Sequence, residues 1–282
     1  MANPVVLHGT ELHIVHSAIA DFDFEISIQG PFVAGSEPLP VVYATDANIW
    51  FGAVANISAM LMMGGEIPPV LTVGIGYPAG AGTADVLRRR IYDLSPTSDE
   101  WYLKVFGSSP LFAGELKGGG APLLFRFMSE ELWPWIAERY NLSSDRTYVG
   151  DSMGGLFGVY TLFNHPGFFR RYVIGSPEMD WDFPRCFDYE ANYAAGHKDL
   201  DAIVFLSAGG AERVLSATLD RATATIFAKA DRAGHTARMG DLLASRHYPS
   251  LKLKTLIFPE ETHFTVAFAL IAHGLRYVFQ AG

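Results

Sequence analysis

The sequence predicts an α/β protein with one domain, residues 1–282, built on an eight-stranded, mostly parallel sheet with helices on both faces. Three observations support this prediction. The chain opens with two alternating strand-like segments, its later apolar runs are separated by helix-compatible stretches, and a glycine-rich motif around Ser152 joins one such run to a helix-period segment. A length of 282 residues is enough for one large domain with a substantial core.

The first two expected strands, 10–17 and 21–29, have the pattern of an antiparallel pair with one wet face. In the second, apolar residues at positions 22, 24, 26 and 28 alternate with polar ones. From residue 40 onwards, short buried strands alternate with helices. The expected strands are 40–45, 70–76, 146–149, 172–175, 202–207 and 251–258. The expected helices are 50–62 with Asn48 as its N-cap, 123–140 with a kink at Pro134, a helix that follows residue 152 and ends at His165, 214–229, 236–247 and 264–279. A long loop joins 76 to 123, and 177–200 has the character of an insertion or lid.

Composition limits the classes of partner. The chain is 49% apolar and 18% charged, as expected for a soluble globular protein, and its net charge of -9 argues against a nucleic-acid surface. Cys186 is the only cysteine, so no intrachain disulfide can form, and a packed thiol is expected. Residues 1–20 lack a basic, then apolar, signal pattern, and no stretch approaches the run of ~18 apolar residues that a membrane span needs. We therefore expect a cytoplasmic protein with no nucleic-acid or membrane partner.

The motif from Gly150 to Gly154 has the form Gly-x-Ser-x-Gly, with Ser152 at its centre. Such a serine sits on a sharp strand-to-helix turn in which the residues two before and two after it must be small. The turn lifts the hydroxyl away from the sheet, and the new helix directs its positive dipole end at that position. A glycine-rich turn that merely packs would have the same sequence, so the functional interpretation depends on finding an acid and a base.

Candidates for both follow strands of the predicted sheet. In an open parallel sheet, ligands bind beyond the carboxyl ends of the strands. Glu212 follows the strand 202–207, and His263 follows the last strand. The order serine, acid, histidine is the one expected for this architecture. Asp231 and Asp241 also precede His263, so the choice of acid stays open between them and Glu212.

Several separated motifs resemble those of the putative esterase family of α/β-hydrolases, nearest to its siderophore trilactone esterase branch. They are Ser152 with the Gly-Gly-Leu-Phe that follows Met153, the segment from Ser176-Pro177 to Trp181, Arg90 to Pro96, and Glu130 to Tyr140. The resemblance covers residues 40–280 and implies an α/β-hydrolase fold. The chain departs from the family at Asp46-Ala47, where Asp-Gly is usual, and at Asp151, where His often precedes the serine.

The resemblance implies a serine esterase that needs no cofactor or metal. Ser152 would attack an ester carbonyl, His263 would take its proton, and Glu212 would hold the imidazole. The oxyanion would be bound by backbone N–H groups of Met153 and of Ala47 or Asn48. Substrate would lie near Asp46, Tyr77, Asp151 and Trp181, although Tyr77 and Trp181 are equally compatible with ordinary packing.

Two other functions stay open. The same three residues could transfer the acyl group to an alcohol, and the fold could serve a non-catalytic binding protein. The expected partner is a small-molecule ester or lactone, and assembly into a homo-oligomer is left open. The run Arg88-Arg89-Arg90 is expected to be solvated, with one ion pair to Asp93.

Overall fold

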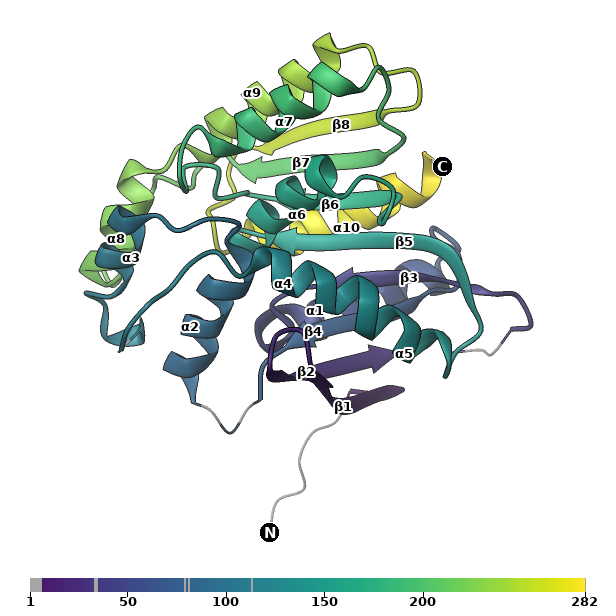
Figure 1. Cartoon of the computed structure of the whole chain (residues 1–282). Helices are drawn as coiled ribbons and strands as arrows, with labels where there is room; N and C mark the ends of the chain where they lie inside the picture. The colour runs from purple at the N-terminus through teal and green to yellow at the C-terminus, as the bar shows by residue number, and fades with distance from the viewer. Residues whose placement is uncertain (1–6, 33–34, 79, 81, 113, 282) are drawn as a thin grey trace.

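A computed structural model describes residues 7–32, 35–78, 80, 82–112 and 114–281. Within them, eight strands form one sheet in the order β1-β2-β4-β3-β5-β6-β7-β8 (Figure 1). The predicted number of strands is confirmed. The strands are β1 (Thr10–Ser17), β2 (Phe22–Gln29), β3 (Leu39–Ala44), β4 (Leu71–Gly76), β5 (Leu142–Asp151), β6 (Arg171–Gly175), β7 (Ile203–Gly209) and β8 (Lys252–Phe258).

The sheet is antiparallel only at its first edge. β2 runs antiparallel to both β1 and β4, and every other neighbouring pair, from β4 through to β8, is parallel. The carboxyl ends of β3 to β8 therefore meet at one edge of the sheet, where ligands bind in this class of fold.

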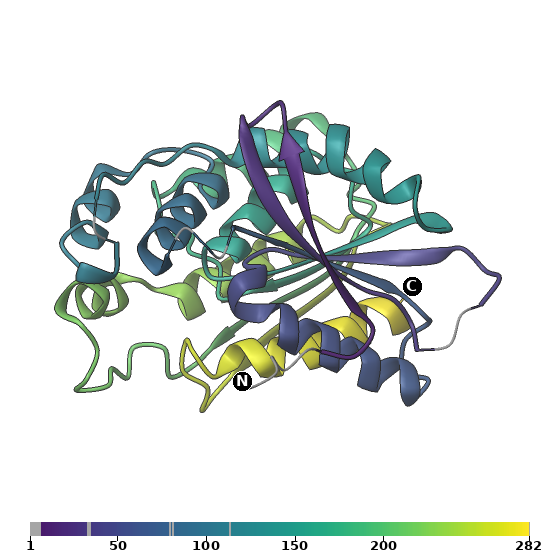
Figure 2. The same cartoon turned by 90° about the horizontal axis from the view of Figure 1, so that it is seen from below.

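Helices cover both faces of the sheet, as predicted. The helices α1 (Ala47–Met63) and α10 (Val266–Gln280) lie side by side on one face (Figure 2). On the other face α6 (Met153–Asn164) lies against β5 and β6, and α9 (Arg232–Ser245) against β7 and β8. The remaining helices are α2 (Thr83–Leu94), α3 (Glu100–Phe106), α4 (Ala121–Arg126), α5 (Trp133–Ala137), α7 (Arg185–Gly196), α8 (Arg221–Lys229) and a 3-10 turn at Pro110–Phe112.

Successive side chains of a strand point to opposite faces of the sheet, so each face of this sheet has its own hydrophobic core. In β3, Val41 and Tyr43 belong to the larger hydrophobic core, whereas Val42 and Ala44 belong to the core under α1 and α10. All four side chains are buried. Because both faces are covered, the inner parallel strands β3, β4 and β7 are mostly continuous apolar runs rather than alternating ones.

Three predicted elements were wrong in extent. The expected loop between 76 and 123 contains α2 and α3, and Ile91, Asp93 and Leu94 of α2 are buried. The expected helix 123–140 is divided into α4, a π-helical segment at Phe127–Leu132 and α5. This irregular turn directly precedes Pro134, which has no N–H to donate and whose ring would clash with the carbonyl group four residues earlier in a regular α-helix. The expected helix 214–229 begins only at Arg221, because the Asp220 carboxylate caps that end.

The predicted N-cap of α1 was also wrong. Asp46 is the N-cap, in the left-handed region at φ 57°, and Asn48 lies inside the first turn. The Asn48 side chain instead accepts a hydrogen bond from the Tyr77 N–H and donates one to the Tyr77 carbonyl, both 2.8 Å long. Two bonds to the backbone beyond β4 thus hold the start of α1 at the carboxyl edge of the sheet.

In the part of the chain that the structure describes, no helix is both long enough and apolar enough to cross a membrane.

Candidate active site

Ser152 occupies a sharp turn between β5 and α6. Its backbone has φ 60° and ψ -116°, outside the regions that residues other than glycine ordinarily adopt. The Ser152 N–H donates a 3.0 Å hydrogen bond to the Gly175 carbonyl at the end of β6, and the Glu178 N–H donates a 3.1 Å bond to the Ser152 carbonyl. The neighbouring strand end therefore holds the strained backbone on both sides.

Glycines are required around this turn for steric reasons. A Cβ on Gly150 would lie 2.4 Å from the Tyr148 hydroxyl oxygen and 2.5 Å from the Gly154 carbonyl oxygen. A Cβ on Gly155 would lie 2.4 Å from the Gly175 carbonyl oxygen. The small residues of the motif thus permit a close approach of the helix to the strand before it and to the next strand.

His263 follows β8 and is buried at the same edge of the sheet. Its Nδ1 lies 2.9 Å from Glu212 Oε2, in hydrogen-bonding contact. The Phe227 ring packs edge-on to the imidazole, with 4.8 Å between the ring centroids. Burial, together with the charge of Arg232, lowers the pKa of His263 below 6.5, although Glu212 acts in the opposite direction. The imidazole is therefore neutral at neutral pH, as a general base must be.

Glu212 is the carboxylate held against that histidine. Its Oε1 accepts hydrogen bonds from the Gly209 N–H, at 2.8 Å, and from the Ser176 hydroxyl. Burial alone would raise the pKa of Glu212, but the hydrogen bonds from His263 and Ser176 and the charges of His263 and Arg232 bring it below its usual value. Glu212 is accordingly an ionised acceptor at neutral pH.

The other two carboxylates that the sequence left open lie elsewhere. Asp231 precedes α9, 3.5 Å from the Arg213 guanidinium. Asp241 is exposed on α9. Of the three, Glu212 is the one in hydrogen-bonding contact with His263.

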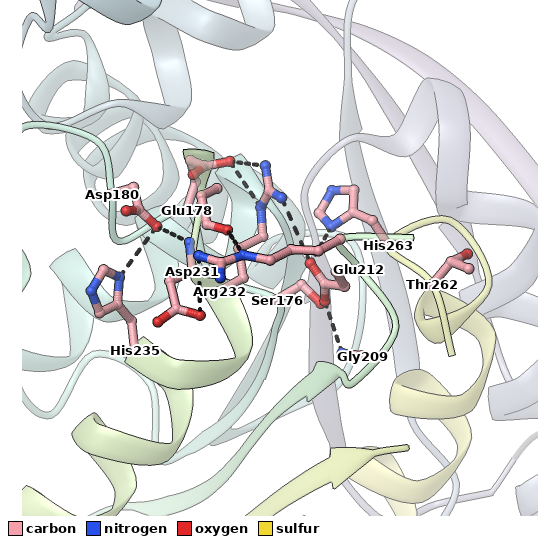
Figure 3. Close-up of polar contacts among 12 residues, drawn as sticks. Ser176, Glu178, Asp180, Gly209, Glu212, Asp231, Arg232, His235, Thr262 and His263 are labelled. Carbon is pink, nitrogen blue, oxygen red and sulfur yellow. Dashed lines mark hydrogen bonds and ion pairs between the residues drawn. The ribbon is translucent and has the colours of Figure 1, made fainter. Parts of the chain in front are cut away.

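The sequence interpretation missed a buried ion pair behind Glu212. The Arg232 guanidinium donates to Glu178 through Nε, at 2.9 Å, and through Nη2, while its Nη1 lies 3.8 Å from Glu212 Oε2. The Tyr102 hydroxyl donates to the other Glu178 oxygen at 2.8 Å. Figure 3 shows the Arg232 guanidinium between the two glutamates, and Arg232 and His263 both contact Glu212 Oε2. No local pattern signals this pair, because its members are 54 residues apart.

The Ser152 hydroxyl and the remaining nitrogen of His263, Nε2, have no hydrogen-bond partner among the described residues. The expected hydroxyl–imidazole bond is thus not formed in this structure. Such bonds are often long or poorly aligned before substrate binds.

The expected oxyanion donors lie at the first turns of two helices. Met153 begins α6, and Ala47 and Asn48 begin α1. The first N–H groups of a helix have no intrahelical acceptor, and the helix dipole favours negative charge there. Both helices begin at the carboxyl edge of the sheet, after β5 and β3 respectively.

The structure gives the four expected substrate-contacting residues different surroundings. Tyr77 lines a cavity of about 590 Å³ between the start of β2 and α2. Asp151 is buried with one carboxylate oxygen unpaired, and burial together with the charge of Glu212 raises its pKa well above the usual value. Trp181 is 1% exposed and donates its indole N–H to the Thr97 carbonyl, which is a packing position.

Asp46, the fourth, accepts a 2.7 Å hydrogen bond from the Arg90 guanidinium. The expectation of a solvated arginine run was therefore wrong at Arg90, whose side chain is 12% exposed and ion-paired to Asp46. The expected ion pair to Asp93 is present and is made by Arg89, at 2.8 Å. The Arg90 pair holds the left-handed residue from which α1 starts. No group of three or more His, Cys, Asp or Glu side chains that could hold a metal is found within the described ranges.

Comparison with known proteins defines the class. The sequence model of the family described as "Putative esterase" matches residues 17–182. The chain belongs to this esterase family, and its sheet, helices and structural neighbours give it the α/β-hydrolase fold.

Relatives within the class are siderophore esterases by name. Ferri-bacillibactin esterase BesA of Bacillus subtilis is 31% identical over 191 residues, which are 65% of this chain and 63% of that protein. Siderophore triacetylfusarinine C esterase of Aspergillus fumigatus is 30% identical over 165 residues, 56% of this chain and 50% of that protein. The matched region therefore spans less than two thirds of either relative. The structure of siderophore hydrolase EstA from Aspergillus nidulans superposes with a TM-score of 0.79 at 21% identity, covering 100% of this chain and 99% of that one.

Proposed function

We propose that the protein hydrolyses a carboxylic ester or lactone through an acyl-enzyme formed on Ser152. The observation that carries this proposal is the buried hydrogen bond between His263 and Glu212 at the edge of the sheet where the strained Ser152 turn also lies. An imidazole oriented by an ionised carboxylate and kept neutral by burial is suited to take a proton from a hydroxyl.

In the first step His263 Nε2 accepts the Ser152 proton while Oγ attacks the ester carbonyl carbon. Glu212 keeps the other imidazole proton on Nδ1, so that Nε2 is the basic nitrogen, and it stabilises the imidazolium that forms. The imidazolium then gives its proton to the leaving alcohol. Water repeats the sequence on the acyl-enzyme and releases the acid.

Negative charge on the carbonyl oxygen would be bound by the N–H of Met153 and an N–H at the start of α1. Each such donor typically contributes ~3–4 kcal/mol to the transition state. The Asp46–Arg90 ion pair and the Asn48–Tyr77 hydrogen bonds would keep the α1 donors in place. In this assignment Asp46 and Trp181 support the site, and Tyr77 and Asp151 remain proposed substrate contacts.

For the substrate, the names of the relatives favour an ester-linked siderophore. We propose this class as the first to be tested, beside simple esters and lactones.

The test is a panel of p-nitrophenyl esters, lactones and siderophore esters given to the wild type, Ser152→Ala and Ser245→Ala. Ser245 is an exposed serine of α9 and provides the matched control. We expect Ser152→Ala to lose at least about 10³-fold in kcat, and Ser245→Ala to be unchanged. A fluorophosphonate probe should label the wild type and the control only.

Three outcomes would contradict parts of the proposal. Wild-type turnover in Ser152→Ala would exclude the acyl-enzyme. No labelling and no turnover would favour a binding protein. Products that shift entirely from acid to new ester when an alcohol is added would favour acyl transfer.

A further inference from the structure

A small cavity lies directly against His263, on the side of the site formed by the segment between β7 and α8. Its volume is about 100 Å³. Most of its wall consists of apolar side chains from three segments of the chain, namely Val214, Leu215, Leu219, Phe227 and Phe264, and the rest comes from Glu212, Ser216, Thr262 and His263.

The polar groups of this wall are nearly all satisfied within the protein. The Ser216 hydroxyl is hydrogen-bonded to the Thr218 hydroxyl at 2.8 Å, and the Thr262 hydroxyl is 3.2 Å from that of Thr265. Both oxygens of Glu212 are already acceptors. Among the described residues that line the cavity, only His263 has a side-chain nitrogen or oxygen without a hydrogen-bond partner, and that atom is Nε2.

The apolar wall is incompletely covered. Val214 is 71% exposed, Phe264 55% and Leu215 37%, so a bound apolar group would remove their surface from water. A cavity of this composition has little to offer a charged or hydroxylated group, because each buried polar atom without a partner costs free energy.

We infer that this cavity binds the apolar alkyl part of the leaving alcohol, and that Leu215, Val214 and Phe264 set a preference for esters of short alkyl alcohols. The inference rests on the proposed function. In ester cleavage the C–O bond to the alcohol breaks, the electron pair stays on the alcohol oxygen, and the proton on His263 Nε2 moves to that oxygen. The oxygen must therefore lie at Nε2, and the carbon chain attached to it enters the adjoining cavity.

The volume limits the chain length. Since an apolar cavity of about 150 Å³ accommodates benzene, one of about 100 Å³ accommodates about three or four carbons. The value of kcat/KM should rise from the methyl ester to the propyl or butyl ester, and it should rise no further for the hexyl ester. Each methylene that enters the cavity should raise kcat/KM by about fourfold, which is the burial of one CH₂ expressed as a rate ratio.

The experiment is a series of acetate esters that differ only in the alcohol: methyl, ethyl, propyl, butyl, hexyl and 2-methoxyethyl. The simple alcohols have nearly equal acidity, so differences report binding of the chain and not leaving-group chemistry. For the wild type we expect a propyl to methyl ratio in kcat/KM of about 15, from two methylenes. The 2-methoxyethyl ester, which has as many non-hydrogen atoms as the butyl ester, should be the poorer substrate of that pair.

Variants locate the preference in this cavity. Leu215→Gln and the nearly isosteric Val214→Thr should both lower the propyl to methyl ratio. Leu12→Gln is the matched control, because Leu12 is 62% exposed on β1, at the edge of the sheet opposite to β8. It should keep the wild-type ratio. Denaturant midpoints of the three variants check that each is folded.

Equal kcat/KM for all of the alkyl esters in an active wild type would overturn the inference. So would a propyl to methyl ratio that is unchanged in both cavity variants, or one that falls as much in Leu12→Gln as in the cavity variants. These outcomes differ from failure of the proposed function, in which the wild type would cleave none of the esters, or would cleave them as well as Ser152→Ala does.

Discussion

Replacing Glu212 separates its structural contribution from its effect on His263. In Glu212→Ala, three donors lose their acceptor: His263 Nδ1–H, the Gly209 N–H and the Ser176 hydroxyl. Each unsatisfied buried donor costs about 1–3 kcal/mol. Arg232, 3.8 Å from the carboxylate, also loses an attraction of about 4 kcal/mol at an effective dielectric constant of ~20. Glu178 still pairs with Arg232, and removing the buried Glu212 charge also removes its desolvation cost of several kcal/mol. We therefore expect Glu212→Ala to lower the free energy of unfolding by about 3–5 kcal/mol.

Glu212→Gln keeps the shape of the side chain and one oxygen acceptor, so its free energy of unfolding should fall by only about 1–2 kcal/mol. Its amide group would face His263 Nδ1 as a donor, which places the imidazole proton on Nε2. With no basic nitrogen toward the serine, kcat should fall by up to about 10⁴-fold. Higher pH should not restore the activity, because the defect is the wrong tautomer and not protonation.

The assay combines kcat and kcat/KM on a p-nitrophenyl ester between pH 5 and 9 with urea unfolding. Asp241→Asn is the matched control, since Asp241 is the exposed carboxylate that the sequence could not exclude as the acid. It should match the wild type in both measurements. Full wild-type turnover in a folded Glu212→Gln would refute the reasoning, because His263 would then need no acid partner.

Two further predictions concern the charge behind the site and the packing beneath it. The neutral form of His263 is the base, so kcat/KM should fall as pH is lowered through the pKa of His263, with a midpoint below 6.5. Burial is the largest cause of that lowered pKa, and the charge of Arg232 lowers the pKa by more than Glu178 raises it. The double variant Arg232→Gln/Glu178→Gln should therefore raise the midpoint, and a pH–rate profile that moves to lower pH would contradict this. Gly155→Ala would place a Cβ 2.4 Å from a backbone carbonyl oxygen of β6, and should destabilise the fold by several kcal/mol, at least about 3. Gly196→Ala, where nothing lies within 4 Å of the added carbon, should unfold at the wild-type midpoint, and equal midpoints for the two variants would disprove the steric argument.

Local pattern in the sequence was enough to predict the sheet. The alternation from Phe22 to Ile28 predicted an antiparallel strand with one wet face, and the continuous apolar runs predicted parallel strands covered on both sides. These signals can be recognised within a few consecutive residues, because alternate side chains of a strand point to opposite faces of the sheet and each face is either buried or exposed. The helix at Thr83–Leu94 had a comparable signal in the spacing of Val86, Ile91 and Leu94, which the run of arginines obscured.

The candidate site could be predicted only in part. The spacing of Gly150, Ser152 and Gly154 indicated a sharp turn, and the strand ends indicated Glu212 and His263. Their catalytic roles stay predictions until the variants are measured. What the sequence determined by itself was the set of residues that the strand order must bring to one edge.

Only the tertiary structure decided which charges meet at that edge. The contact of Glu212 with His263, the Arg232–Glu178 pair behind them, and the Arg90–Asp46 pair that holds α1 join residues 51, 54 and 44 positions apart in the chain. The position of Glu212 after a strand favoured it as the acid, but only the folded surroundings separate it from Asp231 and Asp241, because Glu212 alone of the three contacts His263. The strength of an ion pair depends on the distance between the charges and on their burial. Both are set by how separate helices and loops pack, and the hydrophobic periodicity of a single segment does not indicate that packing.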